Sequence, residues 1–288
     1  MEHIQKKFKN SLFILPLAIF VVASLGYLFI SAFNISIRNV VFLMESPVTG
    51  FKNFIDVLTS NDFWSSMRFS LVFSVLTTVF EAMLGFFLAY FFYKNFRGKR
   101  LLMTLIITPM MIAPSLFGLM SRILFNNFIG LVPNYIRMFF GADIEFFGPD
   151  MVFFTLVLID ILQWTPFIFL IVYSAMLGVP KQTLEAAEID GAGRLRILFN
   201  VIFPFVLPSI ISSGFLRFIE SFRVFDTIFV LTGGGPGNMT TSISIYIYEM
   251  GFSMGKQSVA SAAGLILFLI MLVPTILSVR GIGRSDNY

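Results

Sequence analysis

Polar and ionisable side chains stand at helical spacing inside two long apolar stretches of this sequence. The first stretch presents Asp160, Gln163, Trp164 and Phe167, and the second presents Arg217, Glu220, Ser221 and Val224. Each set follows the i, i+3, i+4, i+7 pattern of a single helix face. Two such faces meeting inside a helical bundle would line a polar cavity with aromatic walls. Aromatic rings beside hydrogen-bonding groups suit a sugar, whose faces are apolar and whose rim carries hydroxyl groups.

The charged residues of the second stretch also allow a purely structural interpretation. Arg217 and Glu220 are three residues apart, as are Arg223 and Asp226, so each pair could be a buried ion pair that holds helices together. The pattern favours the ion pair for Arg223 and Asp226, and the cavity for the face around Arg217. Glu81, in another apolar stretch, could pair with either arginine. If Glu220 pairs elsewhere, Arg217 would be free to bind an anionic sugar.

Other kinds of chemistry have few candidate residues. The chain has no cysteine and a single histidine, His3, which excludes disulfides, thiol nucleophiles and Cys-ligated metals and leaves almost nothing for a His metal site. The nearest approach to a phosphate-binding loop runs from Gly251 to Lys256. It is one residue short between its glycines and lacks the Ser or Thr after the lysine. We therefore expect no catalytic residue, no metal site and no nucleotide site in this chain.

The composition is that of an integral membrane protein. Hydrophobic residues make up 57% and charged residues 12% of the chain, whereas soluble domains carry about 25% charged residues. A helix needs about 20 apolar residues to cross a bilayer, and the stretch after the basic N-terminus is too long for a cleaved signal peptide. The predicted membrane spans are residues 11–33, 67–92, 101–125, 152–177, 205–231 and 259–279. Prolines in the last four predict kinks.

Lysine and arginine are distributed unequally between the two sides of these six spans. They concentrate in the first ten residues, the 93–100 loop, the loop between the fourth and fifth spans, and the C-terminal end. The opposite loops hold only Arg38, Lys52, Arg137 and Lys256. Because basic loops stay in the cytoplasm, both termini are predicted to be cytoplasmic.

A polar insert at Glu185–Pro204 separates the fourth and fifth spans. Its acids come first, its glycines stand at Gly191 and Gly193, and Arg194 and Arg196 follow, the order that helix dipoles favour. The glycines allow a sharp turn between two short amphipathic helices. Such a pair of helices at a membrane surface suits an element that docks against a partner.

This insert resembles the EAA loop of the membrane subunits of binding-protein-dependent ABC importers. The motif consists of Glu-Ala-Ala, three residues, Gly, nine residues and Ile-x-Leu-Pro, and the chain has Glu185-Ala186-Ala187, Gly191 and Val201-Ile202-Phe203-Pro204. Val and Phe replace Ile and Leu, apolar for apolar. The resemblance implies a coupling helix seated in a cleft of the ATPase subunit. The coupling residues would be Glu185, Ala186, Ala187, Asp190 and Gly191.

Two further stretches resemble the carbohydrate, maltose-type branch of this family. Residues 63–89 with Arg97-Gly98, Pro109 and Pro114 resemble the second and third spans, although Phe69-Ser70 replaces the usual Asn-Thr. Residues 225–236, ending in Gly-Gly-Gly-Pro, resemble the end of the fifth span and its outer loop. The resemblance covers roughly residues 10–280. Counting from Glu185 and Pro236 places the family's sugar contacts at Gln163, Trp164, Phe167, Arg217, Glu220, Ser221 and Val224.

The resemblance implies an all-α integral membrane protein with six transmembrane helices and the type I ABC importer permease fold. Residues 1–10 and 281–288 would be cytoplasmic tails around a permease domain at 11–280, with the EAA coupling loop at 178–204. The chain would move a carbohydrate, an oligosaccharide or an acidic sugar, across the bacterial cytoplasmic membrane. It would hold no cofactor, since ATP and Mg would be bound by the partner ATPase. Its partners would be a second similar permease chain, an ATPase dimer and an extracytoplasmic sugar-binding protein, and not nucleic acid.

A secondary transporter driven by an ion gradient is the alternative from another class. Glu81, Asp160 and Asp226 would then be proton or sodium sites. Such transporters usually show internal repeats, and none is visible across these six spans. A channel or a scaffold would not need the EAA loop.

Overall fold

The computed structural model describes residues 2–42 and 44–285 of the 288-residue chain. The chain forms two compact units, and each is described by itself. Unit 1 consists of residues 1–63 and 247–288, and unit 2 of residues 64–246. The predicted tails at 1–10 and 281–288 include residues that lie outside the described part, and none of their side chains is described. Both tails therefore remain predictions.

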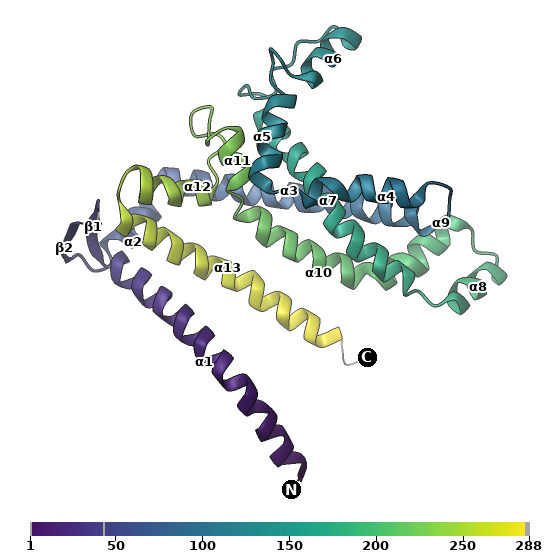
Figure 1. The fold of residues 1–288 in the computed structure, drawn as a ribbon, viewed down its shortest axis with the longest axis horizontal. Helices are drawn as coiled ribbons and strands as arrows, with labels where there is room; N and C mark the ends of the chain where they lie inside the picture. The colour runs from purple at the N-terminus through teal and green to yellow at the C-terminus, as the bar shows by residue number, and fades with distance from the viewer. Residues whose placement is uncertain (1, 43, 286–288) are drawn as a thin grey trace. The chain divides into compact units, whose positions relative to one another are not determined.

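Unit 1 is built on two long helices that contact each other, α1 (Glu2–Ser36) and α13 (Gln257–Ser285) (Figure 1). Its other elements are the strands β1 (Arg38–Val41) and β2 (Met44–Val48), helix α2 (Lys52–Thr59) and the π-helical turn η3 (Glu249–Ser253). The two strands pair antiparallel, a small hairpin that the sequence analysis did not predict.

The hairpin is held to the start of α13 and the turn before it by hydrogen bonds from two of its backbone amides. The amide of Phe42 donates to the carbonyl oxygen of Gly255 at 2.9 Å, and the amide of Val40 donates to Ser258 Oγ at 2.6 Å. Gly255 has φ +68°, and a Cβ there would lie 2.5 Å from the Phe42 ring. The turn before α13 therefore requires glycine, both for its backbone conformation and for the space that the ring fills.

Unit 2 is a bundle of helices, and the first of them is α3 (Asn61–Tyr93). The first three residues of α3 belong to unit 1 and the rest to unit 2. After α3 come α4 (Lys99–Ile107), the 3-10 turn η1 (Thr108–Met111), α5 (Pro114–Leu124), α6 (Leu131–Phe140) and α7 (Val152–Leu177). They are followed by α8 (Lys181–Ile189), α9 (Arg194–Ile197), the π-helical turn η2 (Leu198–Ile202), α10 (Phe203–Phe222), α11 (Asp226–Leu231) and α12 (Ile243–Tyr248), whose last residues belong to unit 1.

The described residues contain five helices long and apolar enough to cross a membrane, or six if one bent pair is counted as a span. The predicted spans 11–33, 67–92 and 259–279 fall within α1, α3 and α13, and the span 152–177 coincides with α7. α7, α10 and α13 continue through Pro166, Pro208 and Pro274.

The third span is broken rather than kinked. Its halves, Lys99–Met111 and Pro114–Leu124, differ in direction by 103°. The break falls at Ala113, which has an extended backbone with ψ 137° and precedes Pro114. A residue before proline avoids the helical conformation, because the proline ring clashes with its backbone. Two prolines five residues apart therefore end one helix and start another.

The fifth span was predicted with wrong boundaries. The helical run begins at Arg194 instead of 205 and ends at Phe222 instead of 231, and α11 is a separate helix. The second short helix predicted in the EAA insert is thus continuous with the span. Proline removes a backbone donor from a helix, and the wider π turn at Leu198–Ile202 just before Pro204 keeps the helix running into α10.

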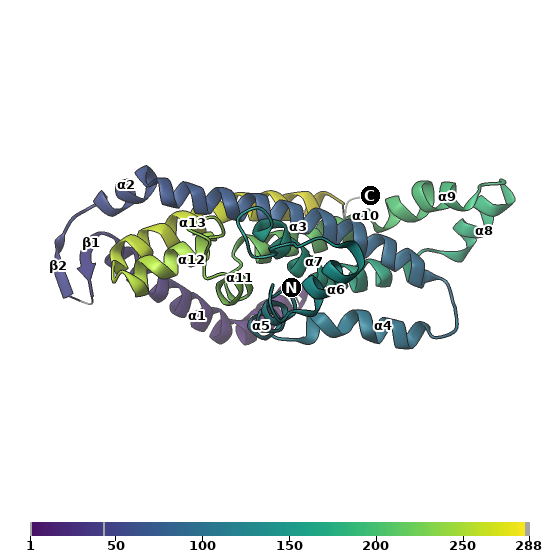
Figure 2. The ribbon, with the colours of Figure 1, turned by 90° about the horizontal axis from the view of Figure 1, so that it is seen from above.

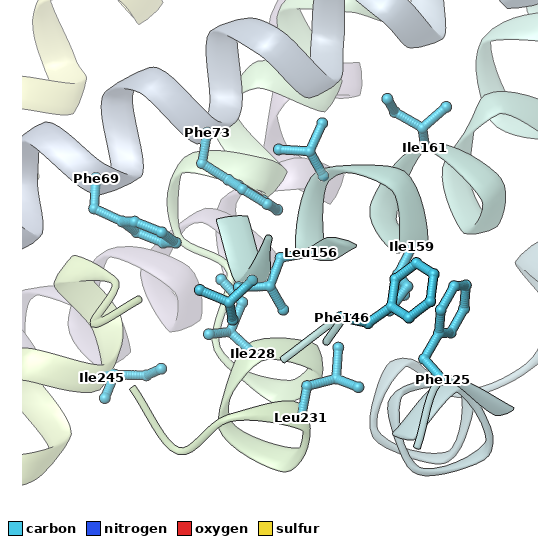
Figure 3. Packing of buried hydrophobic residues seen from close by; sticks show 12 residues of the cluster. Phe69, Phe73, Phe125, Phe146, Leu156, Ile159, Ile161, Ile228, Leu231 and Ile245 are labelled. Atoms are coloured by element: carbon cyan, nitrogen blue, oxygen red, sulfur yellow. The ribbon is translucent and has the colours of Figure 1, made fainter. Parts of the chain in front are cut away.

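Two buried apolar clusters hold unit 2 together. One is formed by residues of α3, α7, α11 and the loops near α5, and Figure 3 shows Phe69, Phe73, Leu156, Ile228 and Leu231 directed toward one another. The other joins α3, α7 and the α9–α10 run around Phe169. α3 and α7 approach so closely at Gly85 that a Cβ there would lie 3.0 Å from Ile168 Cγ2.

Candidate functional site

Three charged side chains from three helices meet inside unit 2. Arg217 of α10 donates from Nε to Glu81 Oε2 at 2.7 Å and from Nη2 to Glu81 Oε1 at 2.9 Å. Its Nη2 also donates to Asp160 Oδ2 of α7 at 2.9 Å. Glu81 comes from α3, and the relative exposures of Glu81, Asp160 and Arg217 are 0%, 2% and 3%. One guanidinium therefore joins α3, α7 and α10 through two buried carboxylates.

Hydroxyl groups and a ring complete this charged cluster. Thr77 Oγ1 and Ser221 Oγ share a hydrogen bond of 2.7 Å, and Ser221 Oγ lies 3.5 Å from Asp160 Oδ2. The guanidinium carbon of Arg217 stands 4.8 Å from the centre of the Trp164 ring, a cation–π geometry. Buried charges are tolerated only when paired and hydrogen-bonded, and these contacts supply that environment.

Small residues let the helices come close enough for these contacts. Gly214 of α10 faces α3, where a Cβ on it would lie 3.6 Å from Thr78 Cγ2. Gly85 of α3 faces α7, where a Cβ on it would lie 3.0 Å from Ile168 Cγ2. Small residues at helix contacts allow close backbone approach in membrane proteins. The sequence therefore places Glu81 and Arg217 within direct reach of each other.

A cavity of about 310 Å³ opens beside the charged cluster. Its walls come from the start of α5, the middle of α7, the C-terminal turns of α10 and the start of α11. The lining residues are Pro114, Asp160, Trp164, Arg217, Glu220, Ser221, Arg223, Val224, Phe225, Asp226 and Thr227. The break in the third span contributes Pro114, and the break after α10 contributes residues 223–225. Polar groups and the Trp164 ring share this space, as the two predicted helix faces suggested.

The structure brings most, but not all, of the predicted contact residues to this cavity. Trp164 of α7 and Arg217, Glu220, Ser221 and Val224 in and after α10 line it.

Gln163 and Phe167 are not among the residues that line the cavity. Gln163 is fully buried, and its Nε2 donates to the carbonyl oxygen of Ile112 at 3.1 Å, at the break between η1 and α5. Phe167 packs against the apolar cluster around Phe169. Helical spacing placed both on the cavity face, but the neighbouring broken span covers Gln163.

Besides Pro114, four lining residues were not on the predicted helix faces. Arg223, Phe225, Asp226 and Thr227 follow Phe222, where α10 ends and the chain changes direction. The only sequence signal was the pairing of charges at 223 and 226.

The ion pair that the sequence favoured, between Arg223 and Asp226, is wrong, and the alternative pair between Arg217 and Glu220 does not form either. Glu220 Oε1 pairs with Arg223 Nη2 at 2.8 Å, with both side chains more than half exposed, and Arg217 pairs with Glu81 and Asp160 instead. The helix ends at Phe222, which changes the direction of the chain between residues 223 and 226. Glu81 does pair with an arginine. Although Glu220 pairs elsewhere, Arg217 is not free.

The EAA insert forms one end of unit 2 (Figures 1 and 2). Helix α8 ends in a Schellman motif, in which Ala192 N donates to Ala187 O and Gly191 N donates to Glu188 O, both at 3.0 Å. Gly191 has φ +74°, the left-handed conformation that this motif requires at its glycine. The predicted turn at Gly191 is confirmed.

The surface of this insert combines acids with exposed apolar side chains. Glu185, Ala186, Asp190 and Gly191 are exposed, and Ala187 is half-buried. Ile189 and Leu195 are 86% and 71% exposed. Apolar side chains on such a polar loop suit burial against another protein. Among the described residues, no group of three or more His, Cys, Asp or Glu side chains could hold a metal ion.

The family model "Binding-protein-dependent transport system inner membrane component" matches residues 81–284. The chain belongs to this family. The permease is a multi-pass inner-membrane subunit of an ABC importer and is not itself catalytic, since ATP is hydrolysed by a partner ATPase. It works in a complex with that ATPase and a periplasmic binding protein. Membership in this family sets aside the ion-gradient alternative.

Known relatives match the permease over nearly its whole length. It is 32% identical to the "Trehalose/maltose transport system permease protein MalF" of Thermococcus litoralis over 95% of this chain and 92% of the relative. It is 29% identical to the "sn-glycerol-3-phosphate transport system permease protein UgpA" of Yersinia pestis, over 86% of this chain and 84% of the relative.

Among solved structures, the fold matches a chain of a bacterial ABC transporter "involved in the import of the acidic polysaccharide alginate". The TM-score is 0.84 at 20% identity, and the match covers 100% of the permease and 99% of that chain. The predicted type I ABC importer permease fold is confirmed.

Proposed function

We propose that the permease forms half of the translocation path of a carbohydrate importer and that its substrate passes the cavity beside Trp164. The observation that carries this proposal is the cavity itself, in which an indole ring stands beside hydroxyl, carboxylate and guanidinium groups. Such a mixture suits the apolar faces and hydroxyl rim of a sugar. Relatives named for trehalose, maltose, glycerol phosphate and alginate transport support a sugar or a sugar-like polyol.

The substrate would touch Trp164, Arg217, Glu220, Ser221 and Val224, because these side chains line the cavity. Gln163 and Phe167, which the sequence also proposed as contacts, would shape the wall from behind. Gln163 fixes the broken third span through Ile112, and Phe167 packs in the core. Both would therefore affect binding only through the position of Trp164.

The coupling site would be Glu185, Ala186, Ala187, Asp190 and Gly191, docked on the ATPase. Helical structure is continuous from Arg194 to Phe222, so a displacement of the insert would be carried directly to Arg217, ~35 Å along the helix axis. The charged cluster joins α10 to α3 and α7, so these helices would move together. Closure of the ATPase dimer would then reorient the cavity.

The full importer would contain a second, similar permease chain, two ATPase copies and an extracytoplasmic binding protein. In the permease, residues 11–280 would be the membrane domain with the coupling loop at 178–204. The second chain would supply the remaining wall of the path, since this chain alone does not enclose the cavity.

The test is ATP-dependent uptake of labelled sugars into vesicles that contain the complex copurified with the tagged full-length chain. We expect uptake of at least one sugar with ATP inside the vesicles and none with an ion gradient alone. A Glu185→Lys variant, altered at the exposed insert, should assemble but transport poorly. Uptake driven by a proton or sodium gradient without ATP would refute the proposal.

A further inference from the structure

Acidic groups outnumber basic groups on the wall of the cavity beside Trp164. The wall carries the carboxylates of Asp160, Glu220 and Asp226 and the guanidinium groups of Arg217 and Arg223. Glu81 lies directly behind Arg217, at 2.7 Å. If both buried carboxyls took up a proton, the sum of these charges would be zero. The net charge of these side chains is therefore zero or negative, whichever of the two buried acids, Glu81 and Asp160, is protonated.

Arg217 has little capacity left for an anionic ligand. Its Nε and Nη2 groups donate to Glu81 and Asp160, and the Trp164 ring covers one face of the guanidinium. Of the three guanidinium nitrogens of Arg217, Nη1 alone donates no hydrogen bond to a residue in the described part of the chain. One amino group can donate to a sugar hydroxyl, but the two-pronged grip that arginine uses for a carboxylate or phosphate is already taken.

Arg223 is balanced in the same way by its own neighbour. Its Nη2 donates to Glu220 Oε1 at 2.8 Å, and both residues line the cavity. Asp226 adds a further carboxylate to the same wall. An incoming anion would therefore meet one arginine held by two buried acids and another held by an exposed acid.

We infer that this wall selects uncharged carbohydrates and excludes anionic sugars. The inference rests on the proposed carbohydrate function and narrows its substrate class. Neutral hydroxyl groups can use the donors and acceptors of Arg217, Ser221 and Glu220 without a net charge. An anion would be repelled by the surplus carboxylates, because like charges in a confined space interact strongly.

The charge of the cavity can be measured with ions that quench the fluorescence of Trp164. The chain has two tryptophans, so a Trp64→Phe background isolates Trp164, and a Trp64→Phe/Trp164→Phe complex gives the signal of the partner subunits for subtraction. The complex is purified in a detergent without a sugar headgroup. The measured quantity is the ratio of the quenching constant for iodide to that for uncharged acrylamide.

We expect acrylamide to quench Trp164 and iodide to quench it less well than it quenches free N-acetyltryptophanamide. Asp226→Asn or Glu220→Gln should raise the iodide ratio about twofold or more, the effect of removing one unit charge from the wall of a small wet cavity. The matched control is Asp143→Asn, which removes an exposed carboxylate paired with Arg137 outside the cavity, and it should leave the ratio unchanged.

Three results would overturn the inference. These are an iodide ratio at or above that of the free indole, a ratio that Asp226→Asn and Glu220→Gln do not change, and a Trp164 that acrylamide cannot reach.

A second measurement uses maltotriose and trigalacturonate, which have the same number of sugar rings but differ in charge. Titrated into the same complex and followed by Trp164 fluorescence, maltotriose should bind at least tenfold more tightly than trigalacturonate. Equal or tighter binding of trigalacturonate would overturn the inference. If neither sugar binds, the carbohydrate function itself fails for these sugars, while the iodide ratio still decides the charge of the wall.

Discussion

The buried charged cluster makes a prediction about stability that depends on which member is removed. Arg217 neutralises two carboxylates that are 0% and 2% exposed. Arg217→Gln leaves both acids buried without a cation, and breaking a buried pair in this way costs about 3–5 kcal/mol. Glu81→Gln or Asp160→Asn leaves one acid paired with the arginine, and the new amide oxygen can still accept a hydrogen bond. Each of these changes should cost about 1 kcal/mol or less.

The measured quantity is the midpoint of thermal unfolding of the detergent-purified complex. Samples are heated to a series of temperatures, and the intact complex that remains is measured by size-exclusion chromatography. At about 2–4 °C per kcal/mol for a chain of this size, Arg217→Gln should lower the midpoint by about 6–20 °C. The matched control is Arg223→Gln, because Arg223 also pairs with a glutamate but is 63% exposed. Exposed pairs contribute about 0–1 kcal/mol, so this variant should melt close to the unmodified protein.

The triple variant Glu81→Gln/Asp160→Asn/Arg217→Gln separates lost charge balance from lost packing. It removes every charge of the cluster and keeps nearly the same volume, so it should regain at least half of the stability lost in Arg217→Gln. The reasoning fails if Arg217→Gln melts within about 2 °C of the unmodified protein. It also fails if Glu81→Gln is the more damaging single change.

Three more predictions concern the coupling loop, the topology and the helix packing. Gly191→Val should reduce transport far more than Gly191→Asn, since asparagine tolerates the φ of +74° found there and valine does not; equal uptake by both variants would contradict this. A cysteine at Asn95 should resist a membrane-impermeant thiol reagent in intact cells, and one at Asn238 should react; the opposite labelling would reverse the orientation. Gly85→Ala should lower the unfolding midpoint of the complex, because the new Cβ would lie 3.0 Å from Ile168, an overpacking that costs about 1–3 kcal/mol of stability. Gly26→Ala is the control and should leave the midpoint unchanged, since a Cβ there would have no atom within 4 Å.

The sequence alone determined the class, the turn at Gly191 and most of the spans. A membrane helix must satisfy its backbone internally, so a long apolar run has one available structure, and α7 coincides with its predicted range of 152–177. The turn at Gly191 was equally predictable, because acids, glycines and bases in that order specify a helix end locally. These features depend on neighbours in the sequence.

Tertiary structure alone decided how the charges pair and which side chains reach the cavity. Arg217 had a candidate partner three residues away in Glu220, but a guanidinium inside a bundle is stabilised by whichever buried carboxylates the packing brings near it. Close helix contacts at Gly85 and Gly214 bring α3, α7 and α10 together, and Glu81 and Asp160 take that place. Gln163 does not line the cavity for a similar reason, because its side chain donates to the backbone carbonyl of Ile112 in the broken third span. Such contacts join residues 51 to 136 positions apart, and local spacing carries no information about them.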